Sequence, residues 1–147
     1  MLKINKINTV SDLGSYSIET IVEFLFTHLG RFGDSKEAIK ASILYAFSDQ
    51  EGKGGFLLTG QSGQELMSVV VVNSTGMSGF IPENILVYIA VRDDQRGKGI
   101  GAAMMKEALN RSEGNMALHV EYDNPARKLY ERLGFKSKYA EMRFEKV

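Results

Sequence analysis

The stretch that decides the fold is ILVYIAVRDDQRGKGIG, residues 85–101. Its first half, residues 85–91, is apolar except for Tyr88, which is typical of a strand covered on both faces of a sheet. Its second half combines glycines with cations and leads into apolar residues at helical spacing. The glycines are Gly97, Gly99 and Gly101, and the cations are Arg96 and Lys98. The sequence therefore predicts a buried strand, a glycine-rich loop and a helix in direct succession.

A loop of this composition is suited to hold a phosphate group. Glycines let backbone N–H groups approach a ligand closely, and the first turn of a helix presents unpaired N–H groups at the positive end of its dipole. The chain has 18 Lys+Arg and 18 Asp+Glu, so the attraction of an anion must be local. Arg96 and Lys98 supply local positive charge. We therefore expect a phosphate or pyrophosphate ligand here, and neither a nucleic acid nor a membrane as partner.

The remaining pattern predicts one α/β domain over residues 1–147, a length that fits a single domain. The expected elements are a strand around residues 2–7, helices from Ser17 to Leu29 and from Asp34 to Phe47, strands at 56–59 and 66–72 joined by a turn, a helix through 104–109, a strand at 116–122, a helix from Asn124 to Gly134 and a last strand at 139–144. Asp34 and Glu37 have the spacing of a helix capping box. This order predicts an α/β (α+β) fold with a mixed, mostly antiparallel sheet flanked by helices.

The composition excludes several kinds of protein. There is no Cys, which excludes disulfides and thiolate metal sites, and with only two His a dedicated metal site is not expected. Residues 1–9 lack the apolar core of a signal peptide, and no run approaches the 18 apolar residues of a membrane span. We expect a cytoplasmic protein without a membrane anchor.

Two other phosphate-binding motifs compete for the glycine loop. A Walker A loop requires Ser or Thr after Gly-Lys, but Gly99 follows Lys98. A dinucleotide fingerprint fits Gly97, Gly99 and Ala102, with Glu121 about 20 residues further on. Only 46 residues follow Gly101, and upstream antiparallel strands suit that fold poorly. A dinucleotide-dependent oxidoreductase stays open as an alternative function.

The loop and the segment NPARKLYERLGF, residues 124–135, together resemble the GNAT family of N-acetyltransferases. Residues 96–101 look like that family's Arg/Gln-x-x-Gly-x-Gly/Ala pyrophosphate loop. Residues 124–135 look like its helix with Asn, Ala and then Leu-Tyr-x-x-x-Gly-Phe. Both motifs lie within residues 86–135, about a third of the chain. The resemblance implies transfer of the acetyl group of acetyl-CoA to a primary amine of a small molecule or peptide, by direct attack in a ternary complex.

The resemblance also implies where acetyl-CoA (coenzyme A) would bind. The cofactor would lie in a splay between the strands at residues 85–91 and 116–122, with its pantetheine arm on backbone groups of the first strand and its pyrophosphate on the glycine loop. The implied cofactor-binding residues are Ile89, Ala90, Val91, Arg96, Gly97, Lys98, Gly99, Ile100, Gly101, Ala102, Asn124, Ala126 and Tyr130. From the pattern alone, Asn124 is also the expected cap of the helix that follows it.

Catalytic and acceptor residues follow from the same resemblance. Tyr130 occupies the family's general-acid position, although its place on an apolar helical stripe also fits a packing role. Glu121 is the favoured general base, with Glu83 and His119 as alternatives. His28, Arg31 and Phe32, at the connection between the first two helices, are the expected substrate residues, although Arg31 and Phe32 also fit ordinary loop positions. A catalytically silent acyl-CoA-binding domain is the other alternative, and either a monomer or a homodimer is compatible with the sequence.

Overall fold

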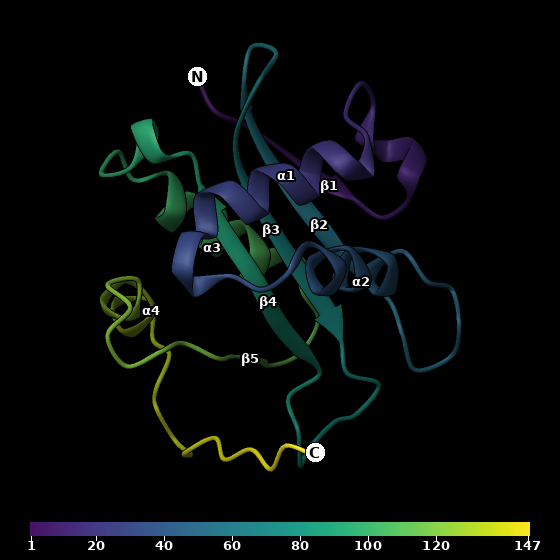
Figure 1. Cartoon of the computed structure of the whole chain (residues 1–147), viewed down its shortest axis with the longest axis vertical. Coiled ribbons are helices and arrows are strands. Elements are labelled where there is room, and N and C mark those ends of the chain that lie inside the picture. Colours follow the sequence, from purple (N-terminus) through teal and green to yellow (C-terminus); the bar gives the residue numbers. More distant parts are fainter.

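The sheet at the centre of the fold has its strands in chain order, β1-β2-β3-β4-β5, in a computed structural model that describes all 147 residues (Figure 1). The strands are β1 (Lys3–Ile7), β2 (Gly55–Ser62), β3 (Glu65–Ser74), β4 (Asn84–Val91) and β5 (Met116–Leu118). Neighbours from β1 to β4 pair antiparallel, and β4 pairs with β5 in parallel. The predicted mixed, mostly antiparallel sheet is confirmed, and it is not the parallel, doubly wound sheet of a dinucleotide-binding fold.

Helices cover both faces of this sheet. They are α1 (Ile18–Leu29), α2 (Lys36–Ala46), α3 (Ile100–Arg111) and α4 (Arg127–Arg132), with short 3-10 turns η1 (Val10–Leu13), η2 (Gly30–Phe32) and η3 (Asp93–Gln95). Figure 1 shows α1 and α2 in front of the sheet and α3 behind it. None of the helices has the length and apolar content needed to cross a bilayer.

The two faces have separate apolar cores, and successive side chains of β3 belong alternately to one and the other. Val69 and Val71 pack with α1 and α2 in a cluster that we call the front core. Val70 and Val72 pack with α3 and α4 in a second cluster, the rear core. All four valines are fully buried. The sheet is therefore covered on both sides at its centre, as the apolar runs in the sequence predict.

A β-bulge interrupts β4 at Val87. Tyr88 pairs with Val71 and Leu86 pairs with Val72, so Val87 has no partner of its own on β3. Leu86 belongs to the rear core and Tyr88 to the front core, although residues two apart on a regular strand share one face. A bulge of this kind bends its strand and increases the local twist.

The strands β4 and β5 part immediately beyond this bulge. Their pairing consists of Asn84 with Met116, Ile85 with Ala117 and Leu86 with Leu118. The chain after Leu118 forms no strand, so the prediction of a strand over residues 116–122 is wrong in its second half. The physical reason is that β4 bends away after Leu86 and offers residues 119–122 no ladder to join. A gap between β4 and the segment after β5 is the result.

Three further expectations about local structure are wrong. The cap of α2 is Ser35, whose Oγ accepts from Ala38 N at 3.1 Å, because the Asp34 carboxylate is engaged with Tyr88 instead. The helix α4 begins at Arg127, since the Asn124 side chain closes a turn by accepting from Ala126 N at 2.9 Å. Residues 139–144 form no strand, because the short β5 edge does not pair with them.

Candidate active site

Backbone groups of β4 face the gap without a partner strand. Arg92 N donates to Met67 O at 2.8 Å, which fixes the hydrogen-bonding phase of the β3–β4 pair. Along an antiparallel pair, alternate residues turn both backbone groups away from the partner. By this alternation the N–H and C=O groups of Ile89 and Val91 point toward the β5 side, where the ladder has already ended at Leu118. An extended ligand could use these groups as a strand would.

The glycine loop forms an open approach to the first turn of α3. Gly97 and Gly99 have φ of 78° and 80°, a left-handed conformation that L side chains rarely adopt. Gly99 is the N-cap of α3, and Ala103 N donates to Gly99 O at 3.1 Å in the first bond of the helix. The N–H groups of Ile100, Gly101 and Ala102 thus have no helical acceptor. A Cβ on Gly97 or Gly99 would meet nothing within 4 Å, so the space in front of these residues is open.

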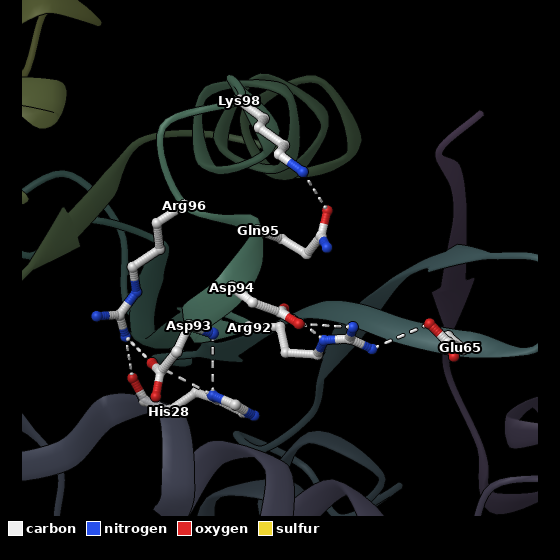
Figure 2. A network of polar contacts seen from close by, with 8 residues as sticks. All are labelled: His28, Glu65, Arg92, Asp93, Asp94, Gln95, Arg96 and Lys98. Carbon is white, nitrogen blue, oxygen red and sulfur yellow. Dashed lines mark hydrogen bonds and ion pairs between the residues drawn. The ribbon is translucent and has the colours of Figure 1, made fainter.

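The cations near the loop have different surroundings (Figure 2). Arg96 Nη2 donates to His28 O at 2.6 Å and lies 2.8 Å from Asp93 Oδ1, so this side chain points toward the end of α1. Lys98 Nζ contacts only a neutral partner, Gln95 Oε1, at 3.2 Å. Lys98 is therefore the loop cation whose charge no carboxylate neutralises.

His28 joins the end of α1 to the turn after β4. Its ring packs on Phe24 with centroids 4.6 Å apart, and its side chain is 16% exposed. Asp93 N lies 3.2 Å from His28 Nδ1 and Asp93 Oδ1 lies 3.4 Å from the same atom. We assign the backbone N–H as the partner, because it is closer and because Arg96 already holds that carboxylate oxygen. His28 therefore fastens two elements together, and only a small part of it is open to a substrate.

Arg31 links the α1–α2 connection to the segment after β5. Its Nη2 donates to Asp123 Oδ2 at 2.9 Å, and its guanidinium lies 4.2 Å from the centroid of the Phe32 ring. The Arg31 hydrogen bond lowers the pKa of the Asp123 carboxyl. Both partners are 66% exposed, so this pair adds little to stability. The structure thus places Arg31 and Phe32 at one end of the gap.

Tyr130 has a buried ring and an accessible hydroxyl. Its ring packs on Phe135 with centroids 6.1 Å apart, and burial raises the pKa of Tyr130 to about 12. The hydroxyl makes no hydrogen bond within the protein, yet every fully buried side-chain polar atom in the structure has a partner. The hydroxyl oxygen must therefore reach the surface, where a ligand could receive its proton.

The start of α4 borders a hollow of about 440 Å³. Its lining residues are Tyr122, Asp123, Asn124, Pro125, Arg127, Lys128 and Glu131. Of the two expected cofactor residues just before α4, Asn124 lines the hollow. Ala126 does not line it, and its backbone N–H already donates to the Asn124 side chain. Arg127 and Lys128 are further cations at this hollow, and their place directly after Asn-Pro-Ala in the sequence was a usable signal.

The carboxylates considered as bases differ in position. Glu83 Oε1 accepts from Asn115 N at 2.7 Å, which lowers the pKa of Glu83 and holds the first residues of β5 beside β4. This end of the strands is the one that stays paired, and Glu83 is the only candidate base among the residues that line a larger hollow of about 570 Å³ beside it. Glu121 and His119 are exposed on the segment that borders the gap, and neither side chain makes a hydrogen bond.

Sequence reasoning missed one contact beside the gap. The Tyr88 hydroxyl on β4 donates to Asp34 Oδ2 at 2.5 Å, which brings a carboxylate from the α1–α2 connection to the strand. These residues are 54 positions apart, so no local pattern could have indicated the pair.

Comparisons with known proteins agree with this architecture. Residues 55–137 match the family model described as acetyltransferase (GNAT) domain, which is more than half of the chain. No curated protein matches. A GNAT-family acetyltransferase from Streptococcus pneumoniae TIGR4 is 16% identical over 99% of this chain and 98% of that one, with a TM-score of 0.71.

Two further solved structures are similar over nearly the whole chain. A ribosomal-protein-alanine N-acetyltransferase from Brucella melitensis biovar Abortus 2308 has 18% identity and a TM-score of 0.63, covering 99% of both chains. An aminoglycoside N-acetyltransferase in complex with CoA has 14% identity and a TM-score of 0.69, covering 99% of this chain and 95% of that chain. At these identities the likeness shows the fold alone. With the family match, the sheet and the glycine loop in agreement, the chain belongs to the GNAT family of acetyltransferases.

Proposed function

We propose that this protein transfers the acetyl group of acetyl-CoA to a primary amine of a small molecule or peptide, by direct attack in a ternary complex. The observation that carries the proposal is the gap between β4 and the segment after β5, where Ile89 and Val91 present unpartnered backbone groups. The glycine loop follows on the same strand, and α4, which carries Tyr130, follows the segment on the other side. The gap therefore adjoins both a candidate anion site and a candidate acid.

The residues present fit coenzyme A. Its pantetheine arm is an extended chain with amide groups, which suits the free backbone of Ile89 and Val91. Its pyrophosphate suits the unpaired N–H groups at the start of α3, where the open space at Gly97 and Gly99 permits close approach. Lys98 would add positive charge. When bound, acetyl-CoA supplies an activated acyl group as a thioester.

Tyr130 is the proposed general acid. With its pKa raised to about 12, the phenol keeps its proton at neutral pH and can deliver it to the departing thiolate. The same apolar surroundings would raise the basicity of a thiolate beside the ring, because desolvation disfavours the charged form. Arg31 and Phe32 are proposed to contact the acceptor, since they lie at one end of the gap.

The proposal is tested by thermal unfolding with acetyl-CoA, combined with a thiol-release assay on a panel of amines. Ligand at about 100 times its dissociation constant should stabilise the fold by about 2.7 kcal/mol. A nicotinamide dinucleotide is the matched control and should give no shift. A shift with the dinucleotide alone would favour the oxidoreductase. A shift with acetyl-CoA but no thiol release with any amine would favour a silent binding domain.

The pH dependence of turnover follows from the Tyr130 pKa. Because the pKa is raised from 10 to about 12, the acid form is lost only as the pH rises through that higher value. We expect kcat, with both substrates saturating, to show no alkaline decline between about pH 7 and pH 10. Unfolding should be followed over the same range as a control. A decline with an apparent pKa below 10 in the folded protein would contradict the assignment.

A further inference from the structure

Tyr88 and Asp34 form a fixed hydrogen-bonded pair beside the gap. The Tyr88 side chain is buried in the front core, and its hydroxyl donates to Asp34 Oδ2 at 2.5 Å. Burial, and then the carboxylate itself, raises the pKa of Tyr88 above its ordinary value, so the phenol is the donor and Asp34 the acceptor. Asp34 is exposed. A carboxylate is thereby held at the surface by a rigid partner, and its second oxygen, Oδ1, accepts no hydrogen bond within the protein. The Arg143 guanidinium is close enough to interact with this carboxylate electrostatically, and Asp34 contributes to the raised pKa of Arg143.

The pair lies next to the backbone that we propose holds the cofactor. Tyr88 immediately precedes Ile89, the first residue whose backbone faces the gap. Asp34 lies in the α1–α2 connection, which also contacts the segment after β5 through the Arg31–Asp123 hydrogen bond. The α1–α2 connection therefore contacts β4 through Asp34 and the segment after β5 through Arg31.

Asp34 and Tyr130 are associated with opposite faces of the sheet. Tyr88, which holds Asp34, packs in the front core, whereas Tyr130 packs in the rear core. At the gap the sheet no longer separates its two faces, because the β4–β5 ladder ends there. An amine approaching from the front and a thiolate leaving toward the rear would each meet one of these groups.

We propose that Asp34 binds the ammonium group of the acceptor and takes its proton, directly or through one water, and that Tyr88 is the positioning residue for this carboxylate. This inference rests on the proposed function and names its substrate class, an amine that arrives as a cation. The ammonium N–H bond breaks and its proton passes to Asp34 Oδ1. The freed electron pair forms the C–N bond, the C–S bond breaks, and the sulfur takes a proton from Tyr130. The second proton of the attacking nitrogen is released to solvent. Asp34 then loses its proton to solvent and Tyr130 regains one from solvent, so that the whole reaction releases one proton.

Other candidate bases have weaker positions. Glu83 is engaged at the paired end of the strands by Asn115 N. Glu121 and His119 are exposed, and their side chains make no hydrogen bond to β4. Asp34 is the carboxylate that hydrogen-bonds to a β4 side chain in the part of the strand that borders the gap.

The deciding variant is Asp34→Asn, because an amide oxygen still accepts from Tyr88 but no longer takes up a proton. We expect kcat/KM for the amine to fall about 100-fold in the thiol-release assay, with an unchanged acetyl-CoA thermal shift. Glu37→Gln, which removes another exposed carboxylate at the start of α2, is the matched control and should turn over normally. Asp34→Glu should recover part of the loss.

Tyr88→Phe tests the positioning role separately. It keeps the buried ring but removes a hydrogen bond to a charged group, so the unfolding temperature should fall by about a few degrees without loss of the fold. The value of kcat should fall about tenfold, with a smaller change in KM. Asp34→Asn turning over within twofold of the unaltered protein would overturn the inference and leave the proposed function standing. Loss of the acetyl-CoA thermal shift in Asp34→Asn would also overturn it, because the residue would then serve the cofactor or the fold. No thiol release by the unaltered protein with any amine would overturn both.

Discussion

Replacing Tyr130 with Phe should lower kcat by about 1000-fold and leave acetyl-CoA binding nearly unchanged, which is the range expected for loss of a general acid. The substitution keeps the ring that packs on Phe135. It also leaves no protein group without a partner, because the Tyr130 hydroxyl makes no hydrogen bond within the chain. Stability should therefore be preserved while proton delivery to the thiolate is lost. Single-turnover thiol release, which isolates the chemical step, is the measurement.

Tyr45→Phe is the matched control for this experiment. The Tyr45 hydroxyl donates to Ser74 O at 2.7 Å, and Ser74 pairs with Asn84 at the end of β4 opposite the proposed site. Its removal should cost about 1 kcal/mol of folding free energy and leave kcat unchanged. If Tyr130→Phe behaved in the same way, with reduced stability and full turnover while chemistry is rate-limiting, Tyr130 would be a packing residue.

Replacing Gly99 with Glu should abolish the thermal shift caused by acetyl-CoA. Gly99 has φ of 80° and open space where a side chain would begin, so a carboxylate there would stand before the first turn of α3. It would occupy the place proposed for the pyrophosphate and repel it. A negative charge near a helix N-terminus is itself favourable, so the variant should fold.

Gly99→Ala separates backbone strain from charge. It imposes the same unfavourable φ, at a cost of about 1 kcal/mol, without a carboxylate. We expect it to lower the unfolding temperature but to keep most of the acetyl-CoA shift. An unchanged shift in Gly99→Glu would mean that the anion binds elsewhere, and the hollow lined by Arg127 and Lys128 would then be the place to examine.

Much of the fold could be predicted because its signals are local. The apolar run at residues 85–91 and the glycines after it identified β4, the loop and the start of α3. The bulge at Val87 could not be foreseen, since it depends on which residues of β3 and β4 face each other. The extent of β5 followed from that bulge. The alternation at residues 139–144 was misleading, because an alternating pattern forms a strand only where a partner edge takes it up.

The same distinction applies to the candidate site. The loop glycines could be located because their conformational freedom is a property of single residues. The partners of the side chains could not be located from the sequence, because they lie far away in the sequence and come together only in the folded chain. Arg96 was expected to face a phosphate, and its contacts are instead with Asp93 and with His28, 68 positions away. The role of Asp34 was likewise hidden, since its spacing to Glu37 suggested only a cap.

The opening beside β4 depends on the bulge at Val87, and that bulge is one extra residue on β4 relative to β3. The length of β4 therefore matters more for the opening than the identity of its side chains. One extra residue on β4 places Val87 and Tyr88 toward the same face, and the chain beyond them resumes its ordinary alternation. Omitting that residue would leave later side chains on their present faces and remove the bend that keeps the two strands apart. We therefore expect deletion of one residue at the bulge to extend the β4–β5 pairing beyond Leu86, whereas substitutions in β4 that keep its length should leave the opening in place.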